Sequence, residues 1–394
     1  MMRWSIFRCW QSCGRLAAAL LAGGLNAAAQ DAAQPSTPLP SNVSLRHEVR
    51  HAIEKGCAWL VTKQNASNYW SSPEHPAVTA LVLTALVGPS PETPASPAIE
   101  KGYAYLLHCV QPDGGIYNKD LQSYNTSVAL SALVLRNRPE DRAVILNARR
   151  FLISLQFADA QLGASNNPFG GGIGYGGTDK LPDLSGTVMA LEAIYNSRPL
   201  AQDTNGIKAP DLNWKAALRF VQNCQNLPGS NAQPWASDDP QNKGGFIYAP
   251  ERSMAGQTNL PSGRIAFRSY GSMTYAGLLS YIYADLKSDD PRVTAALDWL
   301  RGNYSVDENP ALGPQGIYYY YELMAKALTF AGVDILETKD GRKANWREDL
   351  ALKLLNLQHA DGSWANENGR WWEKDANLDS AFAITTLEII ENKL

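Results

Sequence analysis

Ala52-Ile-Glu-Lys-Gly-Cys-Ala-Trp-Leu60 is almost repeated further along the chain as Ala98-Ile-Glu-Lys-Gly-Tyr-Ala-Tyr-Leu106. Two Gly-rich turns also have a similar order of residues, from Gln through Asp-Gly to an aromatic residue. They are Gln111-Pro-Asp-Gly-Gly-Ile-Tyr117 and Gln358-His-Ala-Asp-Gly-Ser-Trp364. Self-similarity of this kind is the sequence mark of a repeat architecture. The chain is therefore expected to repeat one unit, in which a helix with an aromatic and leucine end leads through a Gly-rich turn into a second helix.

Six stretches have apolar residues at helical spacing and carry Lys, Arg and Glu on the other side. They are Leu45–Lys63, Ala98–Cys109, Glu140–Phe157, Asp211–Asn223, Asp290–Asn303 and Asn345–Leu357. Amphipathic helices of this type are typical of an outer, solvent-facing layer.

Six further stretches begin with polar residues and then become almost uncharged. Their starts are His75-Pro76, Tyr124-Asn125, Asp183-Leu184, Ser269-Tyr270, Gly316-Ile317 and Asn377-Leu378. A helix that is apolar all round is buried, so these stretches predict an inner layer. Six outer and six inner helices in alternation predict an all-α fold, an (α/α)6 toroid, whose inner helices all start around one mouth of a central cavity.

The first residues have the pattern of an export signal, with Arg3, Arg8 and Arg15 before a short apolar run and the small residues Ala27-Ala-Ala29 after it. Residues 1–29 are therefore predicted to be a signal peptide, and the protein is expected to be exported to the periplasm or secreted. Residues 30–44 are rich in Pro, Ser, Thr and Gln and predict a disordered linker.

Residues 45–394 are expected to form one toroid domain with a long insertion at about 224–267, which is rich in Gly, Pro, Asn and Ser. No apolar run is long enough to span a membrane. The 35 basic and 38 acidic residues give a net charge of −3 without a clustered basic face, so a nucleic-acid partner is not expected. Beyond the leader an odd number of cysteines remains, Cys57, Cys109 and Cys224, which argues against a disulfide framework.

The two turns resemble those of the prenyltransferase and squalene-cyclase repeat superfamily. The matching residues are Gln358, Asp361, Gly362 and Trp364, with Gln111, Asp113, Gly114 and Tyr117 as a second copy. The resemblance covers Arg46–Leu394 and implies an α/α toroid in which such turns brace the ends of outer helices. It also implies an apolar, isoprenoid-like ligand in the cavity.

The usual catalytic motifs of that superfamily are not intact in this chain. Triterpene cyclases carry Asp-x-Asp-Asp-Thr-Ala at an inner-helix start, with the central Asp as the acid. Here Ala376-Asn-Leu-Asp-Ser-Ala381 has Leu378 at the position of the acid, although Asp379 is kept. The Asp-x-Cys pattern of the zinc-binding protein prenyltransferases does not occur, so neither a metal nor a cofactor is predicted.

The inner-helix starts and the turns supply the candidate site residues. The candidate catalytic residues are Asp183, Asp379 and His75. The candidate ligand-binding residues are Tyr124, Asn125, Arg268, Tyr270, Tyr318, Tyr319, Glu322 and Trp364. For Asp183 and Asp379 two interpretations stand, a helix N-cap and a general acid whose pKa is raised by burial.

Three functions are compatible with this sequence. The first is binding, with or without conversion, of an apolar isoprenoid-like ligand in the cavity. The second is a carbohydrate-active hydrolase or polysaccharide lyase on an α/α toroid, and the third is a non-catalytic scaffold for a component of the cell envelope. A closed aromatic cavity would favour the first, an open acidic groove the second and a filled centre the third.

Overall fold

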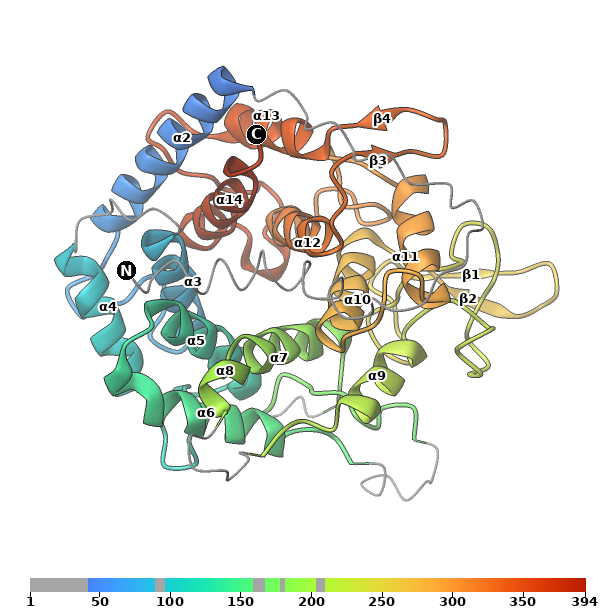
Figure 1. Cartoon of the computed structure of the whole chain (residues 1–394), viewed down its shortest axis with the longest axis horizontal. Helices are drawn as coiled ribbons and strands as arrows, with labels where there is room; N and C mark the ends of the chain where they lie inside the picture. Colours follow the sequence, from blue (N-terminus) through green and yellow to red (C-terminus); the bar gives the residue numbers. More distant parts are fainter. Residues whose placement is uncertain (1–41, 89–95, 159–166, 178–180, 203–209) are drawn as a thin grey trace, which may run out of the picture.

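The structure, a computed structural model, describes residues 42–88, 96–158, 167–177, 181–202 and 210–394. The predicted signal peptide and residues 30–41 of the predicted linker lie outside these ranges. Within them the fold is the expected all-α toroid of two concentric helical rings (Figure 1).

The inner ring consists of six buried helices. They are α3 (Pro76–Val87), α5 (Gln122–Arg136), α7 (Leu184–Asn196), α10 (Gly271–Tyr283), α12 (Ile317–Phe330) and α14 (Ala376–Glu391). Each packs against the next in this order, and α14 packs against α3, so the ring is closed. All six begin within two residues of the predicted starts, because the change from polar to uncharged sequence marks the point at which the chain turns into the core.

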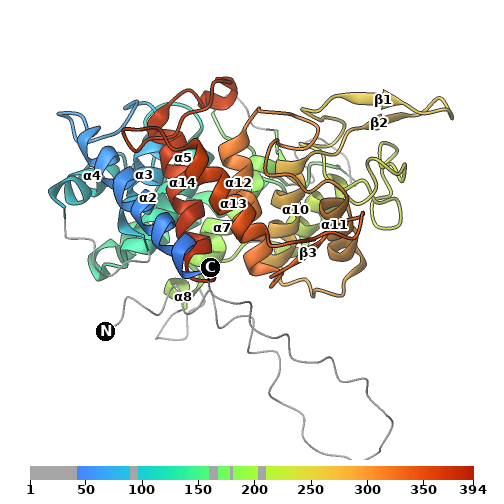
Figure 2. The ribbon, with the colours of Figure 1, turned by 90° about the horizontal axis from the view of Figure 1, so that it is seen from above.

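The outer ring consists of six amphipathic helices. They are α2 (Val43–Thr62), α4 (Pro97–His108), α6 (Arg142–Ser154), α9 (Trp214–Asn223), α11 (Pro291–Gly302) and α13 (Trp346–Leu357). Several of them pack on the inner helix that precedes them in the chain, as α4 does on α3 and α11 on α10. The N-terminal helix α2 packs on α13 and α14, which joins the two ends of the described chain (Figures 1 and 2).

The turn that recurs between outer and inner helices is held by one hydroxyl group. A residue of the turn donates its backbone N–H to a Thr or Ser in the first turn of the following inner helix, over 2.9–3.1 Å. The pairs are Trp70 and Thr79, Ile116 and Thr126, Ile173 and Thr187, Phe246 and Thr274, and Trp364 and Ser380. Five of the six inner helices are anchored in this way, and α12 is the exception.

The turns need glycine where the chain passes close to the next outer helix. Gly171 has a φ of +96°, and a Cβ at this position would lie 2.0 Å from the carbonyl oxygen of Ala216. Only glycine accepts both the left-handed backbone and this approach. The Gly-Gly pairs at 114–115, 171–172 and 244–245 are therefore structural, as the repeat predicts.

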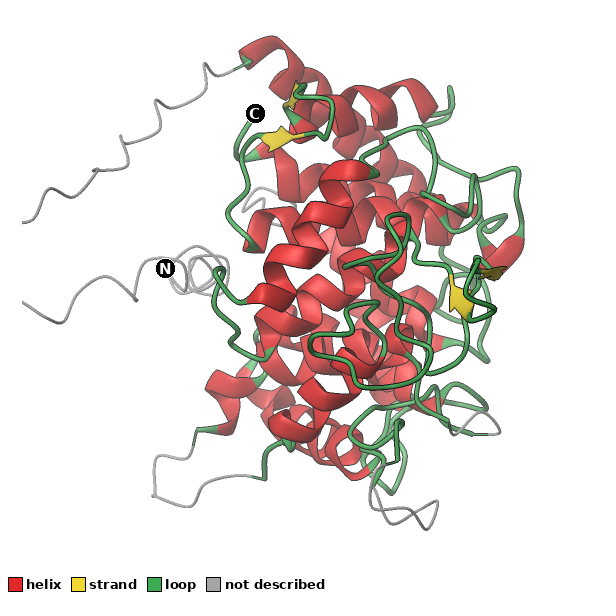
Figure 3. Ribbon diagram, turned by 90° about the vertical axis from the view of Figure 1, so that its right-hand side faces the viewer, coloured by secondary structure: helices red, strands yellow, loops and turns green. Residues whose placement is uncertain are grey.

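Helices make up most of the molecule, and the remaining short elements lie in the connections (Figure 3). They are η1 (Pro139–Asp141), α8 (Arg198–Ala201), η3 (Arg370–Trp372) and the antiparallel pairs β1 (Gln257–Asn259) with β2 (Ile265–Phe267) and β3 (Leu336–Glu337) with β4 (Lys343–Ala344). The first pair projects from the long insertion between α9 and α10 (Figure 2). Both hairpins are too short to show the alternation that a sequence pattern would reveal.

Two further features agree with the composition. Cys57, Cys109 and Cys224 are free thiols, and the last two are buried. Among the described helices, none combines the length and the apolar character needed to cross a membrane.

Candidate functional site

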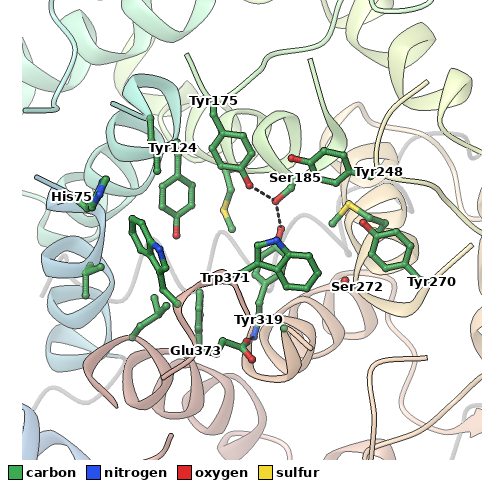
Figure 4. A pocket seen from close by; sticks show the side chains of 18 residues that line it. His75, Tyr124, Tyr175, Ser185, Tyr248, Tyr270, Ser272, Tyr319, Trp371 and Glu373 are labelled. Carbon is green, nitrogen blue, oxygen red and sulfur yellow. Dashed lines mark hydrogen bonds between the residues drawn. The ribbon is translucent and has the colours of Figure 1, made fainter. Parts of the chain in front are cut away.

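A cavity of about 360 Å³ lies where the inner helices begin (Figure 4). All six inner helices, or the residues directly before them, contribute to its wall. The lining residues are His75, Val78, Leu121, Tyr124, Tyr175, Ser185, Met189, Tyr248, Tyr270, Ser272, Met273, Gly316, Tyr319, Trp371, Trp372, Glu373, Leu378 and Phe382. The centre of the toroid is thus hollow and mostly aromatic and aliphatic.

Five tyrosines from different elements surround the cavity (Figure 4). The Tyr175 hydroxyl donates to Ser185 Oγ over 3.0 Å, and Ser185 Oγ lies 3.2 Å from the Tyr319 hydroxyl. Burial raises the pKa of both phenols well above its usual value, so both are neutral at physiological pH. The wall therefore offers aromatic surface together with a few neutral hydroxyls, a combination that suits a largely apolar ligand with few polar groups.

Glu373 is the one carboxylate among the described lining residues, and it caps helix α12. Its two oxygens accept the backbone N–H groups of Ile317, Tyr318 and Tyr319 over 2.8–3.1 Å. Asn366 Nδ2 donates a fourth hydrogen bond of 2.7 Å. A carboxylate is favourable at this position because the helix N-terminus carries partial positive charge and free N–H groups. The start of α12 is thus held by a carboxylate from another connection, whereas the other five inner helices accept a turn N–H on a hydroxyl of their own.

Asp379 lies behind this wall, in the first turn of α14. Its side chain is fully buried; Oδ2 accepts the Asn366 N–H over 2.7 Å, and Oδ1 has no hydrogen-bond partner. Burial, and after it the negative charge of Glu373, raises the pKa of Asp379 to about 9. Asp379 is therefore a protonated carboxylic acid at neutral pH.

The rim of the cavity carries two strained tryptophans. Trp371 and Trp372 have φ values of +55° and +69°, a region that bulky residues rarely adopt, and each is almost half exposed. The His75 ring packs on Trp372 with 4.3 Å between ring centroids, and the Arg370 guanidinium stacks on Trp371. Burial lowers the pKa of His75, so His75 is neutral at pH 7. Backbone strain of this kind concentrates at functional sites.

The structure brings four of the predicted site residues together at the cavity wall, His75, Tyr124, Tyr270 and Tyr319. Glu322 lies one helical turn below Tyr319 on α12 and does not line the wall. Tyr318, the neighbour of Tyr319, is buried against Tyr321 on another side of the same helix.

The remaining predicted residues have structural contacts outside the wall. Asp183 caps α7 by accepting the Gly186 N–H over 2.7 Å. Asn125 accepts the N–H of Ala77 at the start of α3, and Trp364 donates its indole N–H to Leu354. Arg268 is exposed, donates to Thr258 and lines a polar surface groove away from the cavity. Their positions at helix starts and turns suggested a site because cap residues and cavity residues share the same sequence neighbourhood.

Several lining residues were missing from the sequence-based set. Tyr175 and Tyr248 end two Gly-rich turns, so their place in the repeat could have indicated them. Glu373 could not be found in this way, because it lies in a connection that has no counterpart in the other units. The described residues contain no group of His, Cys, Asp and Glu that could hold a metal ion.

No protein-family model and no curated protein matches this chain. Solved structures do match. The type II terpene cyclase MstE from Scytonema, in its apo form, has 13% sequence identity and a TM-score of 0.54, over 89% of this chain and 99% of that chain. A variant of MstE in complex with its substrate, geranylgeranyl dihydroxybenzoate, has 12% identity and a TM-score of 0.50, over 90% and 100%.

A second MstE variant, in complex with its product merosterolic acid A, has 12% identity and a TM-score of 0.51, over 90% of this chain and 100% of that chain. At this level of identity the likeness concerns the fold alone. The chain therefore has the α/α-toroid fold of the terpene cyclases, as the Gln-Asp-Gly-Trp turns predict.

Proposed function

We propose that this protein binds an apolar, isoprenoid-like ligand in its central cavity. The observation that carries the proposal is the composition of the wall, in which tyrosines, tryptophans, methionines and aliphatic residues surround about 360 Å³. Pockets of this size and character bury most of the surface of a small apolar molecule. The shared fold adds support, because MstE is a terpene cyclase whose substrate carries a geranylgeranyl group.

The proposal concerns binding rather than conversion. Protonation of an alkene requires an acid that faces the ligand, and the position of that acid in the triterpene cyclases is occupied here by Leu378, which lines the wall. Asp379 is protonated at neutral pH but does not line the wall. Glu373 lines it, but both of its oxygens accept hydrogen bonds from backbone or Asn366.

The same features favour this proposal over a glycosidase. Hydrolysis of a glycosidic bond uses two carboxyl groups on opposite sides of the substrate. The described wall contains one, Glu373. A filled centre, which would favour a scaffold, does not agree with the cavity.

A substitution that fills the cavity tests the proposal. Met189 lines the wall on α7, so Met189→Trp should occupy part of the space. Leu352→Trp on the outer helix α13 is the matched control, because Leu352 is 50% exposed and distant from the wall. We expect the wild type and L352W to bind farnesol or geranylgeraniol in equilibrium dialysis, and M189W to bind at least about tenfold more weakly. Equal binding by M189W and L352W, both folded by circular dichroism, would refute a ligand site in this cavity.

We further propose that the protein is exported, on the basis of the charged start, apolar run and small-residue segment of residues 1–29. The prediction is that protein recovered from its own host begins close after Ala29. Mass spectrometry of its N-terminal peptide measures this directly. An intact N-terminus on the accumulated protein would contradict export with removal of a signal peptide.

A further inference from the structure

A cluster of buried charges lies directly below the cavity. It consists of Glu192 on α7 and of Glu322 and Lys326 on α12, and all three are less than 9% exposed. Lys326 Nζ lies 2.8 and 3.2 Å from the two carboxylate oxygens of Glu192 and 3.1 Å from Glu322 Oε1. Both partners of each of these ion pairs lie on inner helices.

The depth of the cluster follows from helical spacing. Residues three or four positions apart lie one above the other on a helix face. Glu192 lies three residues beyond Met189, and Glu322 three residues beyond Tyr319, and both Met189 and Tyr319 line the wall. The cluster is therefore one turn deeper than the wall, on the same faces of α7 and α12.

The cluster also crosses the inside of the ring. Helices α7 and α12 are not neighbours, because α10 stands between them and packs against both. Lys326 and Glu192 therefore meet on the inner side of the ring, across α10, which stands between α7 and α12 in Figure 1. Burial, and after it the Glu322 carboxylate, raises the pKa of Tyr124, a wall residue of α5, so the cluster also acts electrostatically on the wall above it.

Below the cluster the interior becomes aromatic again. Tyr283 of α10 packs against Tyr195 of α7 and against Phe330 of α12, with ring centroids 5.2 and 5.8 Å apart. Tyr195 lies three residues beyond Glu192, and Phe330 four residues beyond Lys326, so these rings form the next layer down. The charged cluster separates two aromatic layers that would otherwise be continuous.

Buried charges are costly unless they are paired, and replacing such a cluster by apolar residues of similar volume is often neutral or stabilising. Core packing alone therefore does not account for charges at this position. From its place between the two aromatic layers, we infer that the Glu192–Lys326–Glu322 cluster is the floor of the ligand cavity and limits the length of the apolar ligand. This inference rests on the proposed function, because it assigns a specificity-determining role within the same site.

The test compares two triple variants. E192A/E322A/K326A removes the bulk of the floor, and E192M/E322M/K326M removes the charges but keeps comparable bulk. Binding of geraniol, farnesol and geranylgeraniol is measured for the wild type and both variants by equilibrium dialysis. The alanine variant should shift preference toward the longest alcohol by about tenfold or more relative to the wild type, whereas the methionine variant should keep the wild-type preference.

Each other result has a definite meaning. An unchanged preference in the alanine variant would overturn the inference, and so would the same shift in the methionine variant, because the effect would then come from charge rather than bulk. If none of the three alcohols binds to the wild type or to either variant, the proposed function fails. The floor is then judged by a crystal structure of the alanine variant, in which the cavity should extend to Tyr283, and a cavity that still ends below Met189 would overturn the inference. If the alanine variant does not fold, the variant E192M/E322M/K326A is used instead. It removes bulk only at Lys326, the residue that contacts both glutamates.

Discussion

Asp379 owes its protonated state to burial. The side chain is fully inaccessible, and one of its oxygens has no hydrogen-bond partner. An ionised carboxylate in such a place lacks solvation, and the nearby Glu373 adds repulsion, so the pKa of Asp379 rises to about 9. The sequence left two interpretations open for Asp379, a helix N-cap and a general acid whose pKa is raised by burial. The pKa of Asp379 is raised, but its side chain does not line the cavity.

This raised pKa predicts a particular dependence of stability on pH. An unfolded Asp titrates near pH 3.9, so between about pH 4 and pH 9 the folded state binds one proton more than the unfolded state. The contribution of Asp379 to stability should therefore fall as pH rises, by up to about 1.4 kcal/mol per pH unit in that window.

Asp379→Asn removes the titration and keeps an oxygen that can accept the Asn366 N–H. We expect the stability of the wild type relative to D379N to fall between pH 5 and pH 8, because only the wild type carries the Asp379 side chain that ionises in the unfolded state. Urea unfolding of both proteins at the two pH values measures the difference. A stability difference that does not change between pH 5 and pH 8 would contradict a protonated Asp379.

At the scale of elements, α12 differs from the other inner helices in how its start is held. The other five accept a turn N–H on a Thr or Ser hydroxyl close in sequence, whereas α12 gives three N–H groups to Glu373. Because Glu373 comes from the connection before α14, the same side chain fixes α12, lines the cavity and ends the strained segment with Trp371 and Trp372. The start of α12 and the rim of the cavity are therefore coupled through one carboxylate.

Removing this cap should destabilise the protein. Glu373→Ala leaves three backbone N–H groups of α12 without their acceptor, and leaving a buried donor unsatisfied costs about 1–3 kcal/mol. Glu367→Ala in the same connection is the matched control, since Glu367 is exposed, and surface substitutions usually stay within about 0.5 kcal/mol. Unfolding in urea compares the two variants, and a loss in E373A no greater than that in E367A would show that Glu373 is not a significant cap.

At the scale of the whole molecule, the repeat predicted the architecture almost completely. The periodic change from amphipathic to uncharged helices predicts the two rings and the position of the mouth, because each unit must bury the same faces. The site was predicted only in part. His75, Tyr124, Tyr270 and Tyr319 line the wall because they lie at inner-helix starts that face inward.

The rest of the wall depends on what the repeat does not encode. Trp371, Trp372 and Glu373 come from an irregular connection, and the turn that brings them over the cavity depends on left-handed backbone at two tryptophans, which no sequence rule favours. The direction in which a cap side chain points likewise depends on local hydrogen bonds that the repeat does not encode. Asp183 and Asn125 satisfy helix starts, although their sequence positions are as close to the mouth as those of the tyrosines.

The most direct test of the account is to identify what the protein retains. Wild type and M189W, purified identically from the native host, would be extracted and analysed for small molecules by untargeted mass spectrometry. The account predicts an apolar, isoprenoid-type molecule that accompanies the wild type and is depleted in M189W, where the added indole occupies the cavity. Recovery of no apolar molecule from the wild type, or of the same amount from both proteins, would contradict it.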